Sequence, residues 1–338
     1  MSLPMSARLG RGQYVVVIAG ATGQLGMTVS ETFLDKAYKP FFSSVVCLTR
    51  NPDSDKSKSL AEKGATLRRV DVASHQTSEE DIVETLKAVQ ADILVSTLGI
   101  NDAEAANKLA RAAVKAGVKA YFPSEFGGDH WKNDFPDFEH EEWLHKKKHV
   151  TYAKQIGKGK MKVVSVYNGM LLEDTIGVVG FDTPGGTYTC VGPRNSPFAL
   201  TSKTDIGRSL VFLSLLCMSS PDEVPDAVRL AGSLASVEDI ANAVGKESGK
   251  KIEIKEIDLK EFKQKTRRDT QSGKAESPGQ HIRIMIGEGK MNFEQNDNEV
   301  VNPRGKNWKW KTVEDYIREM KGEPCRDLLN GERQHRAS

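Results

Sequence analysis

The most constraining feature of the sequence is an apolar, β-branched run, Tyr14–Ala19 (YVVVIA), that leads directly into a glycine-rich turn, GATGQLG. A run that is apolar at every position predicts a strand buried on both faces. Glycines permit a tight turn there, and the helix that follows points its positive end at a pyrophosphate. The alternative is a turn without a ligand. We expect a Rossmann-type domain whose dinucleotide contacts include Gly20, Thr22, Gly23, Gln24, Leu25 and Gly26.

Strands and helices alternate through the rest of the first half. Apolar runs predict further strands, and periodic segments with good helix-starting residues predict helices between them. The expected strands are 44–49, 66–70, 93–97, 118–123 and 162–167, and the expected helices are 24–35, 56–63, 78–90 and 102–116. Strict β-α alternation with short connections predicts an α/β fold with a parallel, doubly wound sheet.

The pattern changes after Asn168. The stretch Gly177–Pro197 is rich in Gly, Pro and Thr, and the polar, basic stretch Lys265–Gln280 is expected to be a mobile loop. Helices are expected at 205–218, 237–245 and 312–320, and a strand at 251–257. We therefore predict a dinucleotide-binding domain over residues 1–170 and a smaller α+β substrate-binding domain over 171–338, with segments that can return to pack on the first.

Composition excludes several function classes. The 338 residues include 48 Lys+Arg and 46 Asp+Glu, a formal net charge of +2. Such a balanced charge does not indicate binding to nucleic acid or to a membrane surface. No apolar run reaches the length of a membrane span, and residues 1–12 lack the apolar core of a signal peptide. Widely spaced cysteines favour a reducing compartment over a disulfide scaffold. The four cysteines are Cys47, Cys190, Cys217 and Cys325. We expect a soluble, cytoplasmic protein.

The end of the second strand indicates which dinucleotide is bound. NAD-preferring sites place an acid there, whereas this chain has Thr49 followed by Arg50, whose guanidinium can grip the 2′-phosphate of NADP. Lys58, or its neighbour Lys56, could add a second charge. The alternative is a solvated arginine on a loop. After the third and fourth strands, Asp71 and the run Thr97, Leu98 and Gly99 should flank adenine and the nicotinamide ribose, unless they serve only as caps and turns.

The fifth strand ends in Phe122–Gly127 (FPSEFG), where Ser124 would order the loop and Phe126 would pack on the nicotinamide. The predicted helix that follows carries the three lysines Lys146, Lys147 and Lys148. A lysine beside a nicotinamide can polarise a substrate oxygen, but three successive lysines are also typical of a solvated helix face. No metal site is expected: His140 and His145 are five residues apart rather than the four of HExxH, and His145 and His149, which are four apart, have no evident third ligand. No Tyr-x-x-x-Lys pair occurs in the chain.

Several of these motifs together resemble one family. GATGQLG, Leu48–Arg50 (LTR), Val70–Val72 (VDV), Ser96–Gly99 (STLG), FPSEFG and Thr312–Tyr316 (TVEDY) make the chain similar to NmrA-like proteins, atypical short-chain dehydrogenases. The resembling branch contains isoflavone reductase and phenylcoumaran benzylic ether reductase. The resemblance implies NADP(H) as cofactor, with Thr49 and Arg50 at its 2′-phosphate and Phe126 at its nicotinamide.

The resemblance also implies a reaction and its residues. Such enzymes use NADPH to reduce a phenylpropanoid or related aromatic substrate, with a catalytic lysine on the helix after SEFG. Counting back from Asn168 places it at Lys148, with Lys147 and Lys146 as alternatives, and Asn168 and Gly169 are expected at the substrate. The resemblance also implies a monomer or a homodimer, and a role in secondary metabolism.

Two function classes remain open at this point. The first is an NADPH-dependent reductase acting on an aromatic or polycyclic small molecule. The second is an NmrA-like redox sensor, which binds NADP without turning it over and signals through a protein partner. A lysine that faces the nicotinamide is needed by the reductase and not by the sensor.

Overall fold

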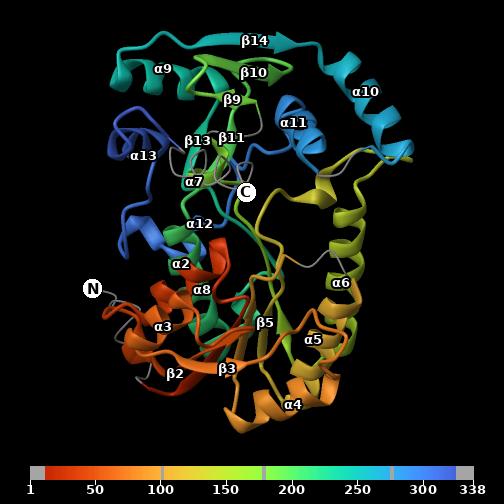
Figure 1. Cartoon of the computed structure of the whole chain (residues 1–338), viewed down its shortest axis with the longest axis vertical. Helices are drawn as coiled ribbons and strands as arrows, with labels where there is room; N and C mark the ends of the chain where they lie inside the picture. Colours follow the sequence, from red (N-terminus) through yellow and green to blue (C-terminus); the bar gives the residue numbers. More distant parts are fainter. Residues whose placement is uncertain (1–11, 100–102, 177–179, 275–277, 325–338) are drawn as a thin grey trace. The chain divides into compact units, whose positions relative to one another are not determined.

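The computed structural model describes residues 12–99, 103–176, 180–274 and 278–324 (Figure 1). The expected helix start at residue 102, the beginning of the Gly-, Pro- and Thr-rich stretch at Gly177, and Cys325 lie outside these ranges. The chain divides into two compact units. Unit 1 contains the chain up to Glu125, His145–Val166 and Ile206–Val228, and unit 2 contains Phe126–Leu144, Tyr167–Asp205 and the chain from Arg229 onward. Each unit is thus assembled from three stretches, which differs from a single boundary after residue 170.

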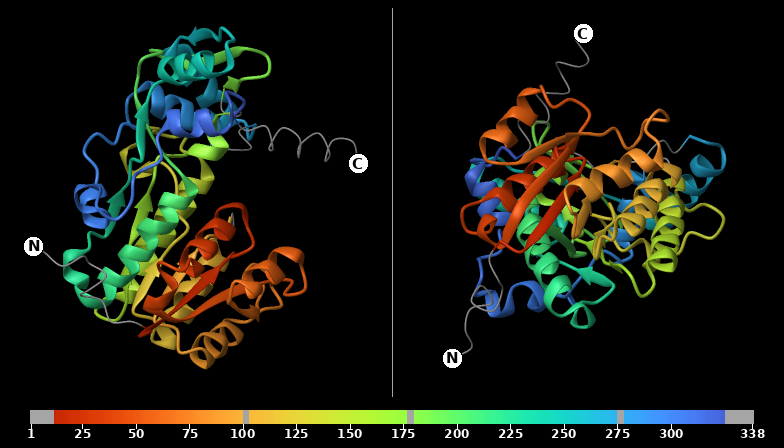
Figure 2. Two further views of the ribbon diagram at one scale, coloured as in Figure 1. Left: turned by 90° about the vertical axis from the view of Figure 1, so that its left-hand side faces the viewer. Right: turned by 90° about the horizontal axis from the view of Figure 1, so that it is seen from below.

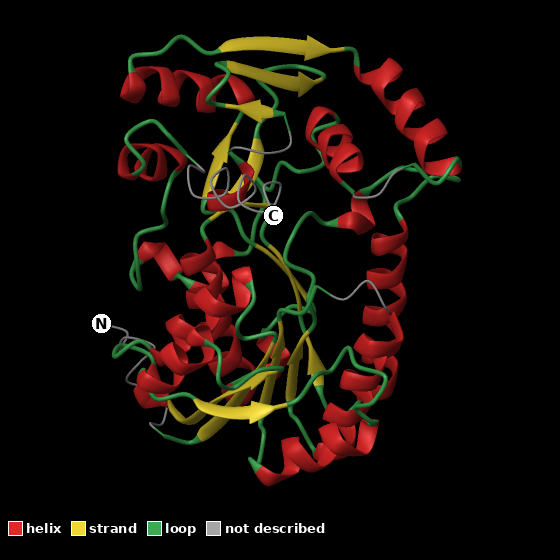
Figure 3. Cartoon of the chain, viewed as in Figure 1, coloured by secondary structure: helices red, strands yellow, loops and turns green. Residues whose placement is uncertain are grey.

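A six-stranded sheet is the framework of unit 1. Its strands run in the order β3-β2-β1-β4-β5-β6, and every neighbouring pair is parallel. This confirms the expected Rossmann-type sheet, whose strands Figure 3 sets apart from the helices. The strands are β1 (Tyr14–Ala19), β2 (Phe42–Thr49), β3 (Thr66–Arg69), β4 (Ile93–Ser96), β5 (Ala120–Phe122) and β6 (Lys162–Val163).

Helices cover both faces of this sheet (Figures 1 and 2). On one face, apolar side chains of α4, α5 and α6 pack with Val17, Val46 and Leu94 in a single buried cluster. On the other, α8 approaches α2 so closely that a Cβ at Gly207 would lie 2.5 Å from the Thr32 hydroxyl. The helices concerned are α2 (Gln24–Leu34), α3 (Asp55–Glu62), α4 (Glu79–Ala88), α5 (Ala103–Ala116), α6 (Glu141–Gly157) and α8 (Lys203–Ser219), with the 3-10 turns η1 (Lys39–Phe41) and η3 (Pro221–Glu223).

Unit 2 is built on two three-stranded mixed sheets, ordered β14-β10-β9 and β13-β11-β8. In each, the central strand pairs in parallel with one neighbour and antiparallel with the other. A further short pair joins β7 (Ser165–Tyr167) to β12 (Ala227–Arg229), most of whose residues belong to unit 1. The strands are β8 (Met170–Leu171), β9 (Phe181–Asp182), β10 (Thr187–Val191), β11 (Phe198–Thr201), β13 (Ser233–Ala235) and β14 (Glu253–Ile257).

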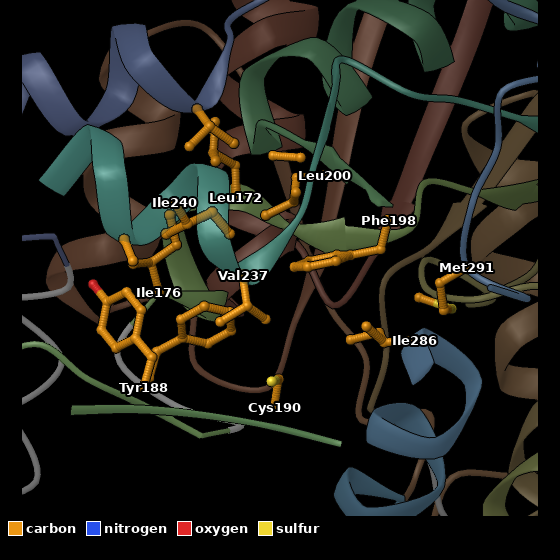
Figure 4. Packing of buried hydrophobic residues seen from close by; sticks show 14 of the residues in the cluster. Leu172, Ile176, Tyr188, Cys190, Phe198, Leu200, Val237, Ile240, Ile286 and Met291 are labelled. Atoms are coloured by element: carbon orange, nitrogen blue, oxygen red, sulfur yellow. The ribbon is translucent and has the colours of Figure 1, made fainter. Parts of the chain in front are cut away.

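Around these sheets, a buried apolar cluster gathers side chains from sequence positions far apart, including Leu172, Tyr188, Phe198, Ile240 and Met291 (Figure 4). Burial of such side chains stabilises unit 2 by about 1.5–3 kcal/mol for each large one. The surrounding helices are α7 (Leu172–Thr175), α9 (Val237–Ser248), α10 (Leu259–Gln271), α11 (Gly279–Gly287), α12 (Asn298–Val301) and α13 (Val313–Glu319), with the 3-10 turns η2 (His130–Lys132) and η4 (Pro303–Gly305).

The expectation of a mobile loop over Lys265–Gln280 is wrong for its described part. Residues 265–271 are the second half of α10, and α11 begins at Gly279. Asp258 caps α10 by accepting a hydrogen bond from the backbone N–H of Glu261 at 2.8 Å. Leu259 and Phe262 pack against the apolar cluster. A few apolar anchors and a cap are therefore enough to order a helix whose remaining positions are mostly polar.

Candidate functional site

The glycine turn is shaped by two close backbone approaches. Gly20 has a φ of +82°, and the N–H of Gly23 donates to its carbonyl at 2.9 Å. A Cβ on Gly26 would lie 2.0 Å from that same carbonyl oxygen and 2.6 Å from the Thr97 hydroxyl. Gly20 is required by its backbone angle and Gly26 by the close packing of α2 on β1.

A pocket of about 240 Å³ opens at the carboxyl ends of β1 to β4, entirely within unit 1. We call it the glycine-turn pocket. Nine of the fifteen residues that the sequence predicts at the dinucleotide line it, together with four apolar neighbours to which the sequence analysis assigned no contact. The lining residues are Gly20, Thr22, Gly23, Leu48, Thr49, Arg50, Val70, Asp71, Val72, Ala73, Thr97, Leu98 and Gly99.

Hydrogen bonds hold the turn after β2 in a defined shape. The buried Thr49 hydroxyl lies 3.1 Å from that of Ser57, and it accepts from the N–H of Asn51 at 3.3 Å. Arg50 is exposed between these anchors, and no described carboxylate forms an ion pair with it. The guanidinium therefore sits at the pocket on an ordered turn.

The two lysines after this turn differ in placement. Lys56 Nζ lies 3.5 Å from the carbonyl oxygen of Thr22, at the edge of the pocket. Lys58 is exposed on α3 and does not line the pocket. Of the two, Lys56 is the lysine beside the glycine turn.

The loop after β4 is tied to the end of β1. Both the N–H and the hydroxyl of Thr97 donate to the carbonyl of Ala19, at 2.8 and 3.0 Å. The Thr97 hydroxyl thus fixes this loop to the end of β1, and the next two residues, Leu98 and Gly99, line the pocket. Asp71 lies opposite, after β3, where its carbonyl accepts from the N–H of Ser74 at 3.1 Å.

The pocket's chemistry fits a phosphate-containing dinucleotide. Gly23 is the N-cap of α2 and has no side chain with which to cap the first turn. The first N–H groups of a helix lack intrahelical acceptors and carry partial positive charge, which an anion satisfies. With Arg50 at the rim, the donor set suits a pyrophosphate at the turn and a second phosphate at the end of β2.

The remaining predicted dinucleotide residues lie away from the pocket lining. Ser124 is half-buried just after β5, and Phe126 is half-buried and belongs to unit 2. Gly26 acts through packing, as described above, and Gln24 is exposed at the start of α2. The residues outside the lining are Gln24, Leu25, Gly26, Lys58, Ser124 and Phe126.

Helix α6 presents the lysine run. Lys148 is exposed, whereas Lys146 and Lys147 are half-buried. The next residue, His149, is only 5% exposed, and it is held between Tyr121 of β5 and Asn107 of α5. Burial lowers the pKa of His149 to about 4, so its ring is neutral at pH 7.

Asn168 and Gly169, the expected substrate residues, are in unit 2. Asn168 is fully buried; its carbonyl accepts from the Thr201 hydroxyl at 2.8 Å. Its side-chain Oδ1 has no hydrogen-bond partner among the described residues. Gly169 has a φ of +66°, and a Cβ there would lie 2.2 Å from the carbonyl oxygen of Ala199.

Sequence reasoning considered His149 only as a metal ligand and missed its two hydrogen-bond partners, the buried Tyr121 and the half-buried Asn107. The available signal was the burial pattern of α6, because His149 shares the inward face with Val150 and Ala153. Over the described ranges, no group of three or more His, Cys, Asp or Glu side chains is arranged to hold a metal ion.

A family model matches nearly the whole chain. The model of the NmrA-like family covers residues 12–319, and the chain belongs to this family. It is 32% identical over 118 residues to a phenylcoumaran benzylic ether reductase of Pinus taeda, a stretch of 34% of this chain and 36% of that enzyme. It is 26% identical over 250 residues to an oxidoreductase, aprR, of Aspergillus flavus, 73% of this chain and 78% of the relative.

Solved structures share the fold. The leucoanthocyanidin reductase of Vitis vinifera, in its NADPH complex, superposes with a TM-score of 0.70 at 20% identity, covering 91% of this chain and 100% of that one. An isoflavone reductase gives 0.69 at 18% identity, covering 91% and 99%. These neighbours show the same fold, and the family model confirms the resemblance to NmrA-like proteins. The expectation of an NADP-dependent enzyme agrees with these relatives, which are named as reductases or an oxidoreductase.

Within the described residues, no helix combines the length and apolar character that crossing a membrane requires.

Proposed function

We propose that this protein is an NADPH-dependent reductase that transfers hydride to an aromatic or polycyclic small molecule. The observation that carries the proposal is the pairing of the glycine turn with Arg50 in one pocket, with no acid at the end of β2. An acid at that position would bind the ribose hydroxyls of NAD, whereas a guanidinium favours the additional phosphate of NADP.

Each part of the pocket has a role in this proposal. The turn Gly20–Gly23 and the start of α2 bind the pyrophosphate. Arg50 binds the 2′-phosphate, Thr49 orders that turn, and Lys56 adds positive charge at its edge. Asp71 and its neighbours flank adenine, and Thr97–Gly99 flank the nicotinamide ribose.

Lys148 is the proposed catalytic residue, with Lys147 and Lys146 as alternatives. NADPH supplies the hydride when bound. The Lys148 ammonium donates a hydrogen bond to the substrate oxygen and stabilises the negative charge that develops there. Its exposure and the lack of any described ion pair leave the amine available to a substrate. Phe126, Asn168 and Gly169 are proposed to contact the nicotinamide or the substrate.

The substrate class rests on the relatives. Those named above are a phenylcoumaran benzylic ether reductase, a leucoanthocyanidin reductase and an isoflavone reductase. We propose an aromatic substrate of secondary metabolism and a cytoplasmic monomer or homodimer. The three described cysteines, Cys47, Cys190 and Cys217, are buried free thiols, which a reducing compartment maintains.

The second candidate is a non-catalytic NADP-binding redox sensor. It is favoured by the exposure of Lys148, which a sensor would leave in solvent. The two are separated by incubating the protein with NADPH and a panel containing a phenylcoumaran, a leucoanthocyanidin and an isoflavone. Catalytic loss of absorbance at 340 nm in wild type, abolished in Lys148→Ala, supports the reductase. A flat trace throughout the panel favours the sensor.

The cofactor assignment is tested by calorimetric titration with NADPH and NADH. Losing the 2′-phosphate contact should cost about 1.5–3 kcal/mol, a factor of roughly ten or more in affinity. We expect wild type to prefer NADPH and Arg50→Ala to lose that preference while its affinity for NADH stays unchanged. Lys58→Ala is the matched control, an exposed cation on the same segment outside the pocket, and should behave as wild type. Equal affinity for both dinucleotides in wild type would contradict the assignment.

A further inference from the structure

A buried polar network runs through unit 1 from α5 to the end of β4. His149 Nε2 lies 3.0 Å from the Tyr121 hydroxyl, and His149 Nδ1 lies 2.9 Å from Oδ1 of Asn107. The Ser96 side chain of β4 also interacts with the Tyr121 phenol. Three elements, α5, α6 and β5, are thus joined by consecutive hydrogen bonds, and Ser96 extends these contacts to β4.

The protons in this network have a defined order. Asn107 presents a carbonyl oxygen to Nδ1, so Nδ1 carries the hydrogen and donates it. Nε2 is then the lone-pair nitrogen and accepts from the Tyr121 hydroxyl. Burial keeps both groups uncharged, since it lowers the pKa of His149 to about 4 and raises that of the Tyr121 phenol. The interaction is therefore a fixed pair of neutral hydrogen bonds at pH 7.

The two ends of this network lie next to functional segments. His149 directly follows Lys148, and consecutive Cα atoms are about 3.8 Å apart. Ser96 directly precedes Thr97, Leu98 and Gly99, which line the glycine-turn pocket. Farther along α6, Ala153 is anchored by apolar packing. Apolar packing is non-directional, whereas hydrogen bonds depend on direction. The two hydrogen bonds of His149 therefore set the rotation and the axial position of α6 next to Lys148.

We propose that His149, Tyr121 and Asn107 are positioning residues that hold Lys148 in register with the nicotinamide end of the glycine-turn pocket. This inference rests on the proposed function, in which Lys148 acts beside the nicotinamide. A long, exposed lysine keeps much rotamer freedom, so its placement depends on the backbone that carries it. Small displacements of a catalytic group strongly reduce rates, by roughly a hundredfold for about 1 Å.

The test follows Lys148 itself and requires no known substrate. Acetylation of Lys148 by an amine-reactive ester is measured by peptide mass spectrometry, with and without saturating NADP⁺. NADP⁺ affinity is measured in parallel by calorimetry. The test variant is Tyr121→Phe, which removes one oxygen. The matched control is Tyr188→Phe in unit 2, where the phenol is also fully buried and lies 2.8 Å from the Thr183 hydroxyl.

We expect NADP⁺ to slow acetylation of Lys148 several-fold in wild type and in Tyr188→Phe. In Tyr121→Phe this protection should be lost, while NADP⁺ affinity and the labelling of Lys58 stay unchanged. His149→Leu should behave as Tyr121→Phe, and His149→Gln, which keeps one donor and one acceptor, should restore much of the protection. A purely structural role would lower the unfolding midpoint and leave protection in the folded protein intact.

Two negative outcomes are distinguishable. Full protection in folded Tyr121→Phe and His149→Leu would overturn the positioning role and leave the proposed function in place. Absence of protection in wild type that binds NADP⁺ would show that Lys148 does not face the nicotinamide, and both the catalytic assignment and its positioning would then fall. Should Tyr121→Phe not fold, the contrast between His149→Gln and His149→Leu decides the matter.

Discussion

Unit 1 and unit 2 use the same kinds of interaction, but they differ in how regularly these contacts are arranged along the chain. In unit 1 each pocket segment follows directly from a strand of one parallel sheet, so that its long-range hydrogen bonds, such as that from Thr97 to Ala19 78 residues away, join neighbouring strand ends. In unit 2, Arg229 pairs with Asp129 across 100 residues, and His281 donates to the carbonyl of Phe138 across 143. A repeated β-α rule organises the first unit, whereas individual long-range contacts organise the second.

This comparison can be tested because the two units carry different probes. All four tryptophans, Trp131, Trp143, Trp308 and Trp310, belong to unit 2. Tryptophan fluorescence therefore reports the unfolding of unit 2, and dinucleotide binding reports the integrity of unit 1. We expect each substitution below to be detected chiefly by the probe of its own unit.

The largest effect is expected at the glycine turn. In Gly26→Ala the new Cβ would overlap the backbone oxygen of Gly20, which a side-chain rotation cannot relieve. We expect loss of NADPH binding and destabilisation of unit 1 by about 3 kcal/mol or more. Gly157→Ala, on α6 and outside the pocket lining, is the control, because a Cβ there would meet its nearest neighbour, Met161, at an ordinary 3.5 Å. Isothermal calorimetry and far-UV circular dichroism measure the two effects; NADPH binding by Gly26→Ala at wild-type affinity would refute the packing argument.

In unit 2 the largest effect is expected at the ion pair of Asp129 and Arg229. Asp129 is 1% exposed and accepts from two guanidinium nitrogens, at 2.9 and 2.7 Å. Removing one partner of a buried pair costs about 3–5 kcal/mol, and the 29% exposure of Arg229 reduces this to about 2–4 for Asp129→Ala. Urea unfolding followed by tryptophan fluorescence measures it, with Asp129→Asn expected between wild type and Asp129→Ala. An unchanged midpoint would show that the long-range pair does not stabilise unit 2.

The buried imidazole of unit 1 predicts a pH dependence. Burial lowers the pKa of His149 from its ordinary 6.5 to about 4. The unfolded chain therefore binds more protons in that window, and stability is lost as the pH falls through it. From pH 7 to pH 5 the loss attributable to His149 is about 2 kcal/mol.

Urea unfolding by far-UV circular dichroism at both pH values, in wild type and His149→Gln, measures this effect. The variant should lose that share of the pH dependence. Equal pH dependence in the two proteins would mean that His149 titrates normally in the folded state.

The smallest expected effects come from a matched pair of helix caps, one in each unit. Ser78 and Asp81 form a capping box on α4, and Ser236 and Asp239 form one on α9. Ser78→Ala and Ser236→Ala should each cost about 1 kcal/mol. Only Ser236→Ala should shift the fluorescence midpoint, and a shift of equal size in Ser78→Ala would show that the two units unfold as one.

Unit 1 can be predicted from the sequence more completely than unit 2. The expected strands of unit 1 appear within a few residues of their places, because strands buried on both faces leave uninterrupted apolar runs. The pocket segments also lie where strand ends predict them, at Gly20, Arg50, Asp71 and Leu98. In unit 2 the sequence predicts a loop over 265–280 where the second half of α10 lies, since the order of this helix depends on a few anchors, Leu259 and Phe262 among them, that meet distant residues.

The parallel sheet, the glycine turn and the cation at the end of β2 can be predicted from the amino-acid sequence alone, because they depend on local periodicity and backbone chemistry. By contrast, the contacts of His149 with Tyr121 and Asn107, 28 and 42 residues away, become visible only in the folded chain. The same holds for the ion pair between Asp129 and Arg229. The physical reason is that a polar side chain is buried only where a partner exists, and partners drawn from distant segments leave no periodic trace in the chain.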